Sequence, residues 1–433
     1  MKTKWAWLGA CAIMGSLSAF AQDKSLSIQE AIQLATTQSK EAKAVDTKVI
    51  GKKLELGVTK NKQLPEAKIS GQFAVLSTPD VNFKIPLGEN GAPEIKANQL
   101  LLGQANISMP IYTGGKIKNS IHIAETAIEA EQFSAQNTKE QLASQAIKLY
   151  VALYKAQQTV KLMEENIKRA EQQVSDFKAM EKNGLIARND LLKSELQLSN
   201  YQVALQEANK NVNVVNYQLI TLLQFDEKTH IDQINFSNEN NLLVTQFSEE
   251  TALLNRNELK LLEKQHEIAE EQLKISKADY LPNVAFTGSY MAVDVKNVIT
   301  VTNALNVGVG LSYDLGALYK NKKNVAVAKH HIAEVEEQIQ IANDRVKIQV
   351  QQANENYQLA QNQEKLYVQA VEQANENYRI VKDKYDNGIA DTDDLLEADV
   401  QQLQSKINVA VSKANVIEKY YDLLLANGHL ISK

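Results

Sequence analysis

The chain has 433 residues and a formal net charge of −5, and 23% of its residues are charged, 44% hydrophobic and 6% aromatic. So few aromatic residues argue against a large conventional globular core. The acidic balance excludes the broad basic surface that neutralises phosphates, so no nucleic acid is expected as a partner. The single cysteine excludes a disulfide framework and a zinc site made of thiolates.

Residues 1–21 have the pattern of an export signal. Lys2 and Lys4 precede a mostly apolar stretch at residues 5–17, which is too short to span a bilayer. Residues 19–21 (Ala-Phe-Ala) then match the small-x-small pattern of a cleavage site. We therefore expect an exported protein.

An alternative for the same segment is a lipoprotein signal in which Cys11 is lipidated, although the apolar stretch before Cys11 is short for that purpose. Beyond the signal, no segment approaches the roughly 18 consecutive apolar residues of a transmembrane helix. Any membrane span is therefore expected to consist of strands.

Proline and glycine divide the rest of the chain into long tracts. Between residues 116 and 280 the only glycine is Gly184, and between residues 317 and 427 the only one is Gly388; neither tract contains proline. Proline and glycine disfavour helix interiors, so these tracts predict long helices. The predicted helices cover residues 27–62, 116–182 and 188–224 in the first half, and 246–278, 317–386 and 391–427 in the second.

The longest tract carries the apolar spacing of a coiled coil. Apolar residues recur there about every 3.5 positions, which is the spacing of a seam between packed helices. The seam consists of Ala328, Ile332, Val335, Ile339, Ala342, Val346, Ala353, Tyr357, Ala360, Tyr367, Val371, Ala374, Tyr378, Val381 and Tyr385. These residues are expected to hold helices together.

Four segments alternate apolar and polar residues. They lie at about residues 67–76, 101–111, 283–293 and 301–313. The pattern is typical of a transmembrane β-strand, and equally of a soluble sheet with one wet face. Export and the length of the helices favour the membrane interpretation.

The chain is an internal duplication, because each half reads helix, strand pair, long helix, turn and shorter helix. Residues 183–195 align with residues 387–399 without a gap. We therefore predict a signal peptide at 1–21, a first repeat at 22–240 and a second at 241–433. The predicted fold class is mainly α, with a pair of membrane strands in each half.

The predicted lengths indicate a rod that must assemble with copies of itself. In each half, the two shorter helices together match the long one, which would extend about 100 Å at about 1.5 Å per residue. Four strands cannot close a barrel in lipid, where free sheet edges are forbidden. A dimer would supply eight strands and a trimer twelve, and the strand count alone does not choose between them.

Residues 26–32 (LSIQEAI), together with the two Asn-Gly turns followed by Asp-Leu-Leu, resemble the TolC family of outer membrane efflux proteins. The resemblance covers about residues 25–428. It implies a homotrimer with a 12-stranded β-barrel in the Gram-negative outer membrane and an α-helical barrel in the periplasm. It further implies the exit duct of a tripartite efflux or type I secretion system, joined to an inner-membrane pump by a periplasmic adaptor protein.

In this family the two turns form the periplasmic tip, which contacts the adaptor and controls the entrance of the duct. The resemblance assigns the tip turns to Asn183, Gly184, Asn387 and Gly388, and the entrance to Asp394, Glu397, Asp190 and Tyr385. Tyr385 would hold the entrance closed with Asp190 as its partner. TolC itself has an arginine two residues after the turn glycine, where this chain has Ala390, and nothing assigns that role to the nearby Arg188.

These residues also have structural interpretations. Asp190 and Asp394 can cap helices, and the turn glycines are expected in the left-handed conformation that ends a helix. Asp394 and Glu397 are three residues apart and therefore share a helix face. That placement favours a pore-facing role, in which an acidic mouth attracts cations.

No catalytic residue, cofactor or metal is predicted. Gly114-Gly115-Lys116 is followed by Ile117 and not by the Ser or Thr of a phosphate loop, and the six histidines are scattered. Without an ATP-binding motif, conduction would be passive. The alternative to a channel is a periplasmic coiled-coil scaffold or adhesin without a pore.

Overall fold

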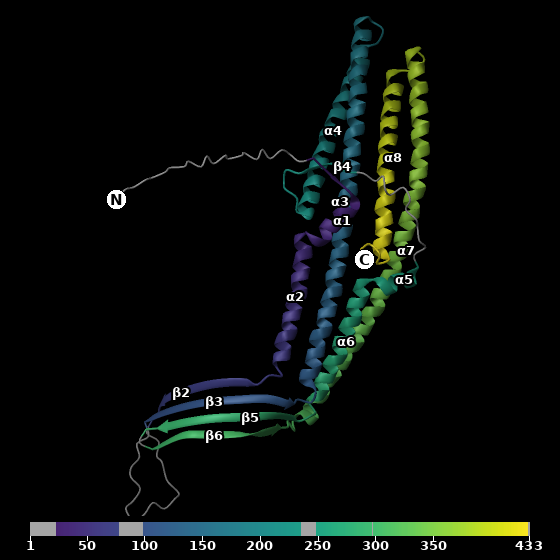
Figure 1. Ribbon diagram of the computed structural model, residues 1–433. Helices are drawn as coiled ribbons and strands as arrows, with labels where there is room; N and C mark the ends of the chain where they lie inside the picture. The colour runs from purple at the N-terminus through teal and green to yellow at the C-terminus, as the bar shows by residue number, and fades with distance from the viewer. Residues whose placement is uncertain (1–22, 78–97, 235–247, 297, 432–433) are drawn as a thin grey trace, which may run out of the picture. The chain divides into compact units, whose positions relative to one another are not determined.

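The computed structural model describes residues 23–77, 98–234, 248–296 and 298–431, which form helices α1–α8 and strands β1–β6 (Figure 1). The predicted signal peptide with Cys11 and the predicted repeat boundary at residue 240 lie outside the described residues. The chain divides into two compact units. Unit 1 comprises residues 1–43, 139–247 and 350–433, and unit 2 comprises residues 44–138 and 248–349.

The four longest predicted helices are confirmed. Helices α3 (Lys116–Lys182) and α7 (Ala317–Asp386) have the predicted bounds, and both contribute to each unit. Helices α4 (Arg188–Leu223) and α8 (Thr392–Ala426) differ from the prediction by a residue at their ends. The absence of proline and glycine therefore located these helices correctly.

The predicted helix at 27–62 is wrong in one respect, because the chain breaks it into α1 (Ile28–Thr37) and α2 (Lys40–Asn61). The Ser39 hydroxyl accepts the N–H of Ala42 at 3.1 Å, so a new N-cap begins α2. A serine cap inside a helix-forming tract is hard to distinguish from an ordinary surface serine.

The predicted helix at 246–278 is likewise divided, into α5 (Glu249–Asn255) and α6 (Asn257–Ala278). Arg256 between them has extended backbone angles, φ −61° and ψ 120°. Its guanidinium binds Glu258 and Gln349, each at 2.8 Å. Tertiary contacts therefore accompany a break that no glycine or proline marks.

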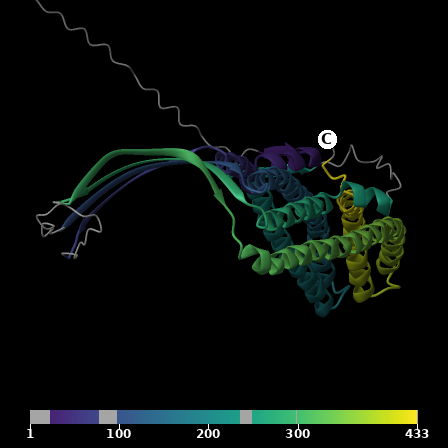
Figure 2. The ribbon, with the colours of Figure 1, turned by 90° about the horizontal axis from the view of Figure 1, so that it is seen from below.

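Unit 2 contains the four predicted strands, which are confirmed as β2 (Glu66–Val75), β3 (Gln99–Tyr112), β5 (Asn283–Val295) and β6 (Ile299–Ser312). They form one antiparallel sheet in the order β2-β3-β5-β6 (Figure 1). The sheet is curved along its strands (Figure 2). Among the described residues, the outer edges of β2 and β6 have no strand partner.

The strand register places many of the apolar residues on one face. Ile69 is opposite Ala105, which is opposite Tyr290, which is opposite Leu305. The β6 residues of this face are 64–72% exposed, and they are Leu305, Val307, Val309 and Leu311. A soluble sheet would cover such a face with another layer, so this sheet presents an apolar surface that water does not favour.

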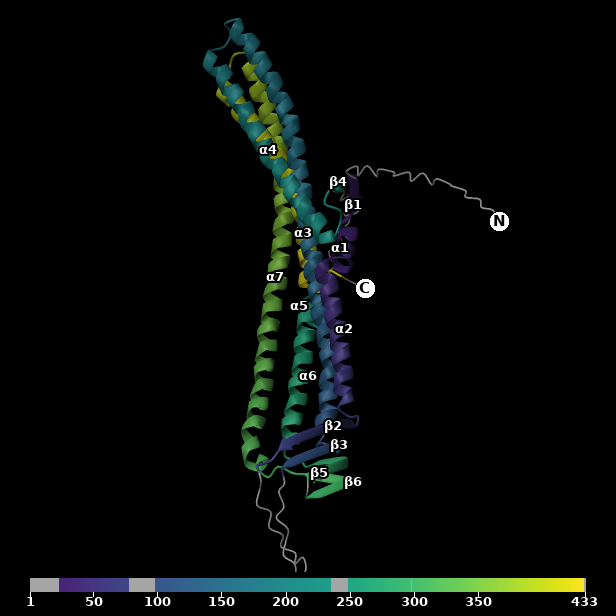
Figure 3. The same ribbon diagram turned by 90° about the vertical axis from the view of Figure 1, so that its left-hand side faces the viewer.

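The helices of unit 2 lie side by side in the order α2, α3, α6 and α7 (Figure 3). Polar contacts connect successive neighbours: the ion pairs Lys60–Glu125 at 3.2 Å and Lys264–Glu129 at 3.0 Å, and a contact between the His266 ring and the Glu336 carboxylate at 3.3 Å. Partly exposed contacts of this kind add little stability. No helix in the described part of the chain is both long and apolar enough to cross a membrane.

The largest core of unit 1 surrounds Tyr150, whose hydroxyl donates to the carbonyl oxygen of Leu26 at 2.8 Å. Leu26 ends strand β1 (Asp23–Leu26), which pairs in parallel with β4 (His230–Ile234). Ser27 then caps α1 by accepting the N–H of Glu30 at 3.1 Å. The opening segment thus joins a buried strand to a capped helix, and the small sheet was not predicted because both strands are short.

The predicted seam along α7 is buried over its central part, at Val346, Ala353, Tyr357 and Ala360. Nearer the C-terminal end of α7, the seam residues from Val371 to Tyr385 are half-buried. The seam therefore packs firmly in the middle of the helix and more loosely toward its end.

We predict that Gly114→Ala destabilises the chain more than Gly115→Ala. Both glycines have positive φ, +63° and +87°, so either alanine costs about 1–2 kcal/mol. A Cβ at Gly114 would also lie 2.9 Å from the Ala278 carbonyl oxygen, which adds about 1–3 kcal/mol of overpacking. Thermal unfolding followed by circular dichroism measures both variants, and equal shifts would contradict the prediction.

Candidate functional site at the tip of unit 1

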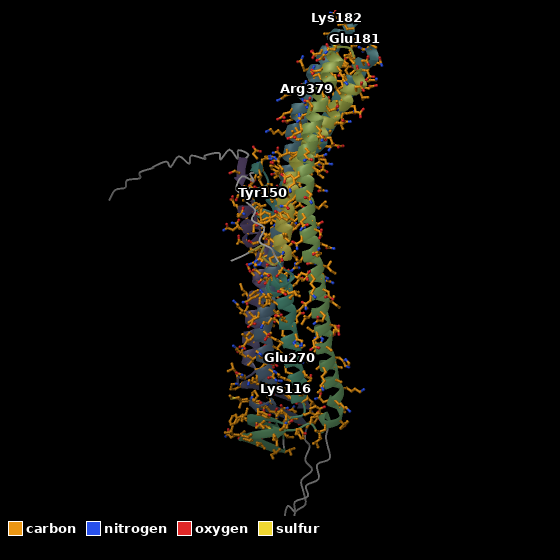
Figure 4. The ribbon with its side chains drawn as sticks, turned by 90° about the vertical axis from the view of Figure 1, so that its right-hand side faces the viewer. Lys116, Tyr150, Glu181, Lys182, Glu270 and Arg379 are labelled. Atoms are coloured by element: carbon orange, nitrogen blue, oxygen red, sulfur yellow. The ribbon has the colours of Figure 1, made fainter. Side chains whose placement is uncertain are left out.

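The two predicted turns lie at the same end of unit 1 (Figure 1). We call residues 177–195 and 381–399 the tip. Figure 4 shows Glu181 and Lys182 at the end of α3, with Arg379 near the end of α7. The tip is therefore formed by two helical hairpins, α3/α4 and α7/α8.

The two turns share one backbone motif. Gly184 and Gly388 both have φ +71°, as predicted for residues that end a helix in the left-handed conformation. The N–H of Leu185 donates to the Met180 carbonyl oxygen at 2.9 Å, and the N–H of Ile389 donates to that of Lys384 at 2.8 Å. Both are Schellman motifs, so the duplication extends to individual hydrogen bonds.

The helices that follow the turns begin differently. Asp391 caps α8 by accepting the N–H of Asp394 at 2.9 Å, while the Asp394 carboxylate accepts the N–H of Asp391 at 3.4 Å. Helix α4 begins after Ala187, which has no side chain that can cap. Asp394 thus takes part in the cap of α8. Asp190 lies in the first turn of α4, whose N-terminus has no side-chain cap.

Asp394 and Glu397 share a hollow between α7 and α8. The hollow has a volume of about 290 Å³ and is lined by Asn377, Val381, Lys384, Ala390, Asp394, Glu397, Ala398 and Gln401. Both carboxylates are exposed. The structure therefore brings the two predicted acidic residues together beside the position where TolC has an arginine.

Tyr385 packs inside the tip. Its ring stacks on Phe177 with centroids 5.6 Å apart, which joins α7 to α3. Its hydroxyl is buried without a hydrogen bond of ordinary geometry, and Thr392 and Asp190 are the polar groups that act on it. Burial, together with the Asp190 charge, raises the Tyr385 pKa. The predicted pair Tyr385 and Asp190 are thus electrostatic neighbours.

An ion pair that was not predicted connects the two hairpins. Lys193 of α4 donates to the Asp393 carboxylate of α8 at 2.7 Å, and this contact is the main cause that raises the Lys193 pKa. Arg188 instead lies 3.8 Å from Glu181 of its own hairpin. Lys193, and not Arg188, therefore provides a cationic contact between hairpins at the tip.

A buried polar network lies at the base of the tip, and sequence analysis missed it as well. The Asp399 carboxylate accepts hydrogen bonds from the Tyr201 hydroxyl at 2.8 Å and from the Asn166 side-chain amide at 3.4 Å. Arg169 donates to Gln402 at 2.7 Å and also to Asn166, and its guanidinium lies 3.9 Å from Asp399. Burial first, and then the charge of Asp399, strongly raise the Tyr201 pKa.

The sequence did contain a signal for this network. Asp399 and Gln402 occupy the buried stripe of α8, which otherwise consists of apolar or small residues such as Leu395, Ala398 and Leu403. Polar groups at core positions need hydrogen-bond partners, so they point to a matching set on the neighbouring helices. Across the described residues, no group of three or more His, Cys, Asp or Glu side chains could hold a metal ion.

Hairpins with equivalent turns, a curved four-stranded sheet and very long helices define a TolC-like channel fold. Solved structures confirm the fold. The chain has a TM-score of 0.78 and 16% identity to the CmeC outer membrane channel of Campylobacter jejuni, over 99% of this chain and 94% of that one. The outer membrane protein VceC of Vibrio cholerae has a TM-score of 0.75 and 14% identity, over 93% of this chain and 96% of that one. CusC has a TM-score of 0.80 and 13% identity, over 93% and 92% of the two chains.

Residues 250–429 match the sequence model of the outer membrane efflux protein family. No curated protein sequence matches the chain. The matched segment includes the second pair of strands, α7, the second turn and α8. The resemblance inferred from the duplicated turns is thus confirmed, and so is the predicted fold class.

We predict that Tyr201→Phe is more destabilising than Tyr385→Phe. Removal of the Tyr201 hydroxyl takes a hydrogen bond from a buried carboxylate, at a cost of about 1.5–3 kcal/mol. The Tyr385 hydroxyl has no such partner, so its removal should change stability by less than about 0.5 kcal/mol. Denaturant unfolding of the two variants tests this, and equal losses would show that the Asp399 contact does not stabilise the tip.

Proposed function

We propose that the protein is the outer membrane channel of a tripartite efflux or type I secretion system. It conducts substrates passively from a periplasmic adaptor and an inner-membrane pump to the exterior. The observation that carries the proposal is the sheet of unit 2, which has an exposed apolar face and two unpaired edges. Lipid accepts the apolar face, and copies of the chain pair the edges.

The edges also indicate how copies meet. Strand β2 follows α2 in the chain and strand β6 precedes α7, so each free edge adjoins one of the two outermost helices of unit 2. Joining β6 of one copy to β2 of the next is a heterologous contact, which forms a ring when the rotation from copy to copy closes. Three copies supply twelve strands, as the family resemblance implies.

Exposed apolar stripes on the two outermost helices support the same contact. Ile50, Leu54 and Val58 repeat every fourth residue on α2 and are more than half exposed. Val327, Ile341 and Ile348 are similarly exposed on α7. Contact between α2 of one copy and α7 of the next would remove both stripes from water.

The tip supplies the adaptor contact and the entrance. Asn183, Gly184, Asn387 and Gly388 form the two turns, and the residues that follow the glycines, Leu185 and Ile389, are 70% and 75% exposed. An adaptor protein can cover these apolar side chains. Asp394 and Glu397 line the entrance, and Asp190 beside Tyr385 helps to keep it closed.

The Lys193–Asp393 ion pair contributes to closure in place of the arginine that is absent at Ala390. It connects the α3/α4 hairpin to the α7/α8 hairpin, so separation of the hairpins must break it. Exposed ion pairs contribute little to stability, which makes the contact readily reversible.

We predict that purified protein conducts ions in planar bilayers and that Asp394→Asn with Glu397→Gln weakens its cation preference. Neutral amides keep the cap on α8 but remove the negative field at the mouth. Glu227→Gln, which neutralises an exposed carboxylate outside the tip, is the matched control. Reversal potentials in asymmetric salt provide the measurement.

Two results would contradict this account. Protein that stays soluble without detergent and shows no conductance would favour the scaffold or adhesin. An unchanged reversal potential in the double variant would leave Asp394 and Glu397 with a structural role only.

We further predict that Leu54→Glu reduces assembly of the trimer in detergent. It places a charge in the middle of the exposed stripe on α2, where the next copy would exclude water. Lys48→Glu changes the charge of an exposed residue that is neither three nor four positions from any residue of the stripe, and it should leave assembly intact. Sedimentation in detergent measures the mass of both, and a fully trimeric Leu54→Glu variant would exclude this face from the interface.

A further inference from the structure

The contacts that hold the α7/α8 hairpin to the α3/α4 hairpin differ in burial along α8. Close to the turn, the contact is Lys193–Asp393, with side chains 40% and 66% exposed. Two turns further along α8 it is Asp399, which is nearly inaccessible to solvent. The same helix is therefore attached weakly at one point and strongly at another.

The strong attachment joins three helices. Asp399 of α8 accepts from Tyr201 of α4 and from Asn166 of α3, and Gln402, one turn later, accepts from Arg169 of α3. Asn166, Asp399 and Gln402 are all buried. If α8 moved away, a buried carboxylate and a buried amide would lose their partners together, which makes separation at this level unfavourable.

The weak attachment has no such penalty. Water can replace either partner of the Lys193–Asp393 pair as the two side chains separate. The Tyr385 hydroxyl has no hydrogen bond of ordinary geometry to lose, although its ring would leave Phe177. The tip can therefore open at a lower free-energy cost than the segment beyond Asp399.

We propose that Asp399 is a positioning residue that anchors α8 to α3 and α4, so that the movement that opens the entrance is limited to the part of the α7/α8 hairpin between Val381 and Ala398. Between the turn and Asp399 the hairpin moves, and on the other side of Asp399 the helices stay packed. The network thereby sets the length of the moving segment, which in turn limits how wide the entrance opens.

A pair of buried leucines on α8 tests this directly. Leu395 and Leu403 lie on opposite sides of Asp399 in sequence, and each is 5% exposed. Each is replaced singly by cysteine in the full chain, in a background without Cys11. The rate of maleimide labelling then reports how often that position opens to solvent.

The expected result depends on the background. With Lys193→Ala and Tyr385→Ala, which loosen the tip, Leu395→Cys should label about tenfold faster, and Leu403→Cys should label at its original rate. Adding Asp399→Ala should extend the acceleration to Leu403→Cys. Asp399→Asn, whose amide oxygen can still accept from Tyr201, should restore most of the protection.

Two outcomes would overturn the proposal. One is equal acceleration of both cysteines when only the tip is loosened, and the other is unchanged labelling of Leu403→Cys when Asp399→Ala is added. Circular dichroism identifies any variant that has simply lost its helices. The inference rests on the proposed function only in treating the tip as an entrance, and labelling needs no conductance, so the two can fail separately.

Discussion

The backbone N–H and C=O groups at the two free edges of the sheet need hydrogen-bond partners, and the rest of the structure depends on this requirement. Strands β2 and β6 each have one side without a partner among the described residues, and the sheet shows a broad apolar face. In lipid, unpaired N–H and C=O groups each cost several kcal/mol, whereas the apolar face is favourable. Edge pairing between copies satisfies both conditions, and the helices that adjoin the edges are then brought together as well.

The duplication shows how one backbone motif acquires two roles. Both turns end in a Schellman motif with exposed apolar residues after the glycine, but only α8 has an aspartate cap, because Ala187 stands where the second repeat has Asp391. The acidic residues collect around the second turn. We propose that the α7/α8 hairpin is specialised as a charged mouth, while the α3/α4 hairpin provides Lys193, Tyr201 and Asn166, which contact it.

Much of this fold could be predicted from the sequence because its signals are local. A tract without proline or glycine gives α3 and α7 their full length, and alternation gives the strands. The breaks at Ser39 and Arg256 could not be predicted, since a side-chain cap and tertiary contacts make them. At the tip, the turn glycines followed from spacing, whereas Lys193–Asp393 and the Asp399 network depend on which helices become neighbours, which spacing along one chain does not reveal.

Electron microscopy of the purified protein in detergent tests the central claim most directly. The account predicts particles with threefold symmetry, in which a ring of strands and a ring of helices enclose one continuous central bore. A uniform population of single chains without a bore would contradict it, because the sheet edges would then remain unpaired.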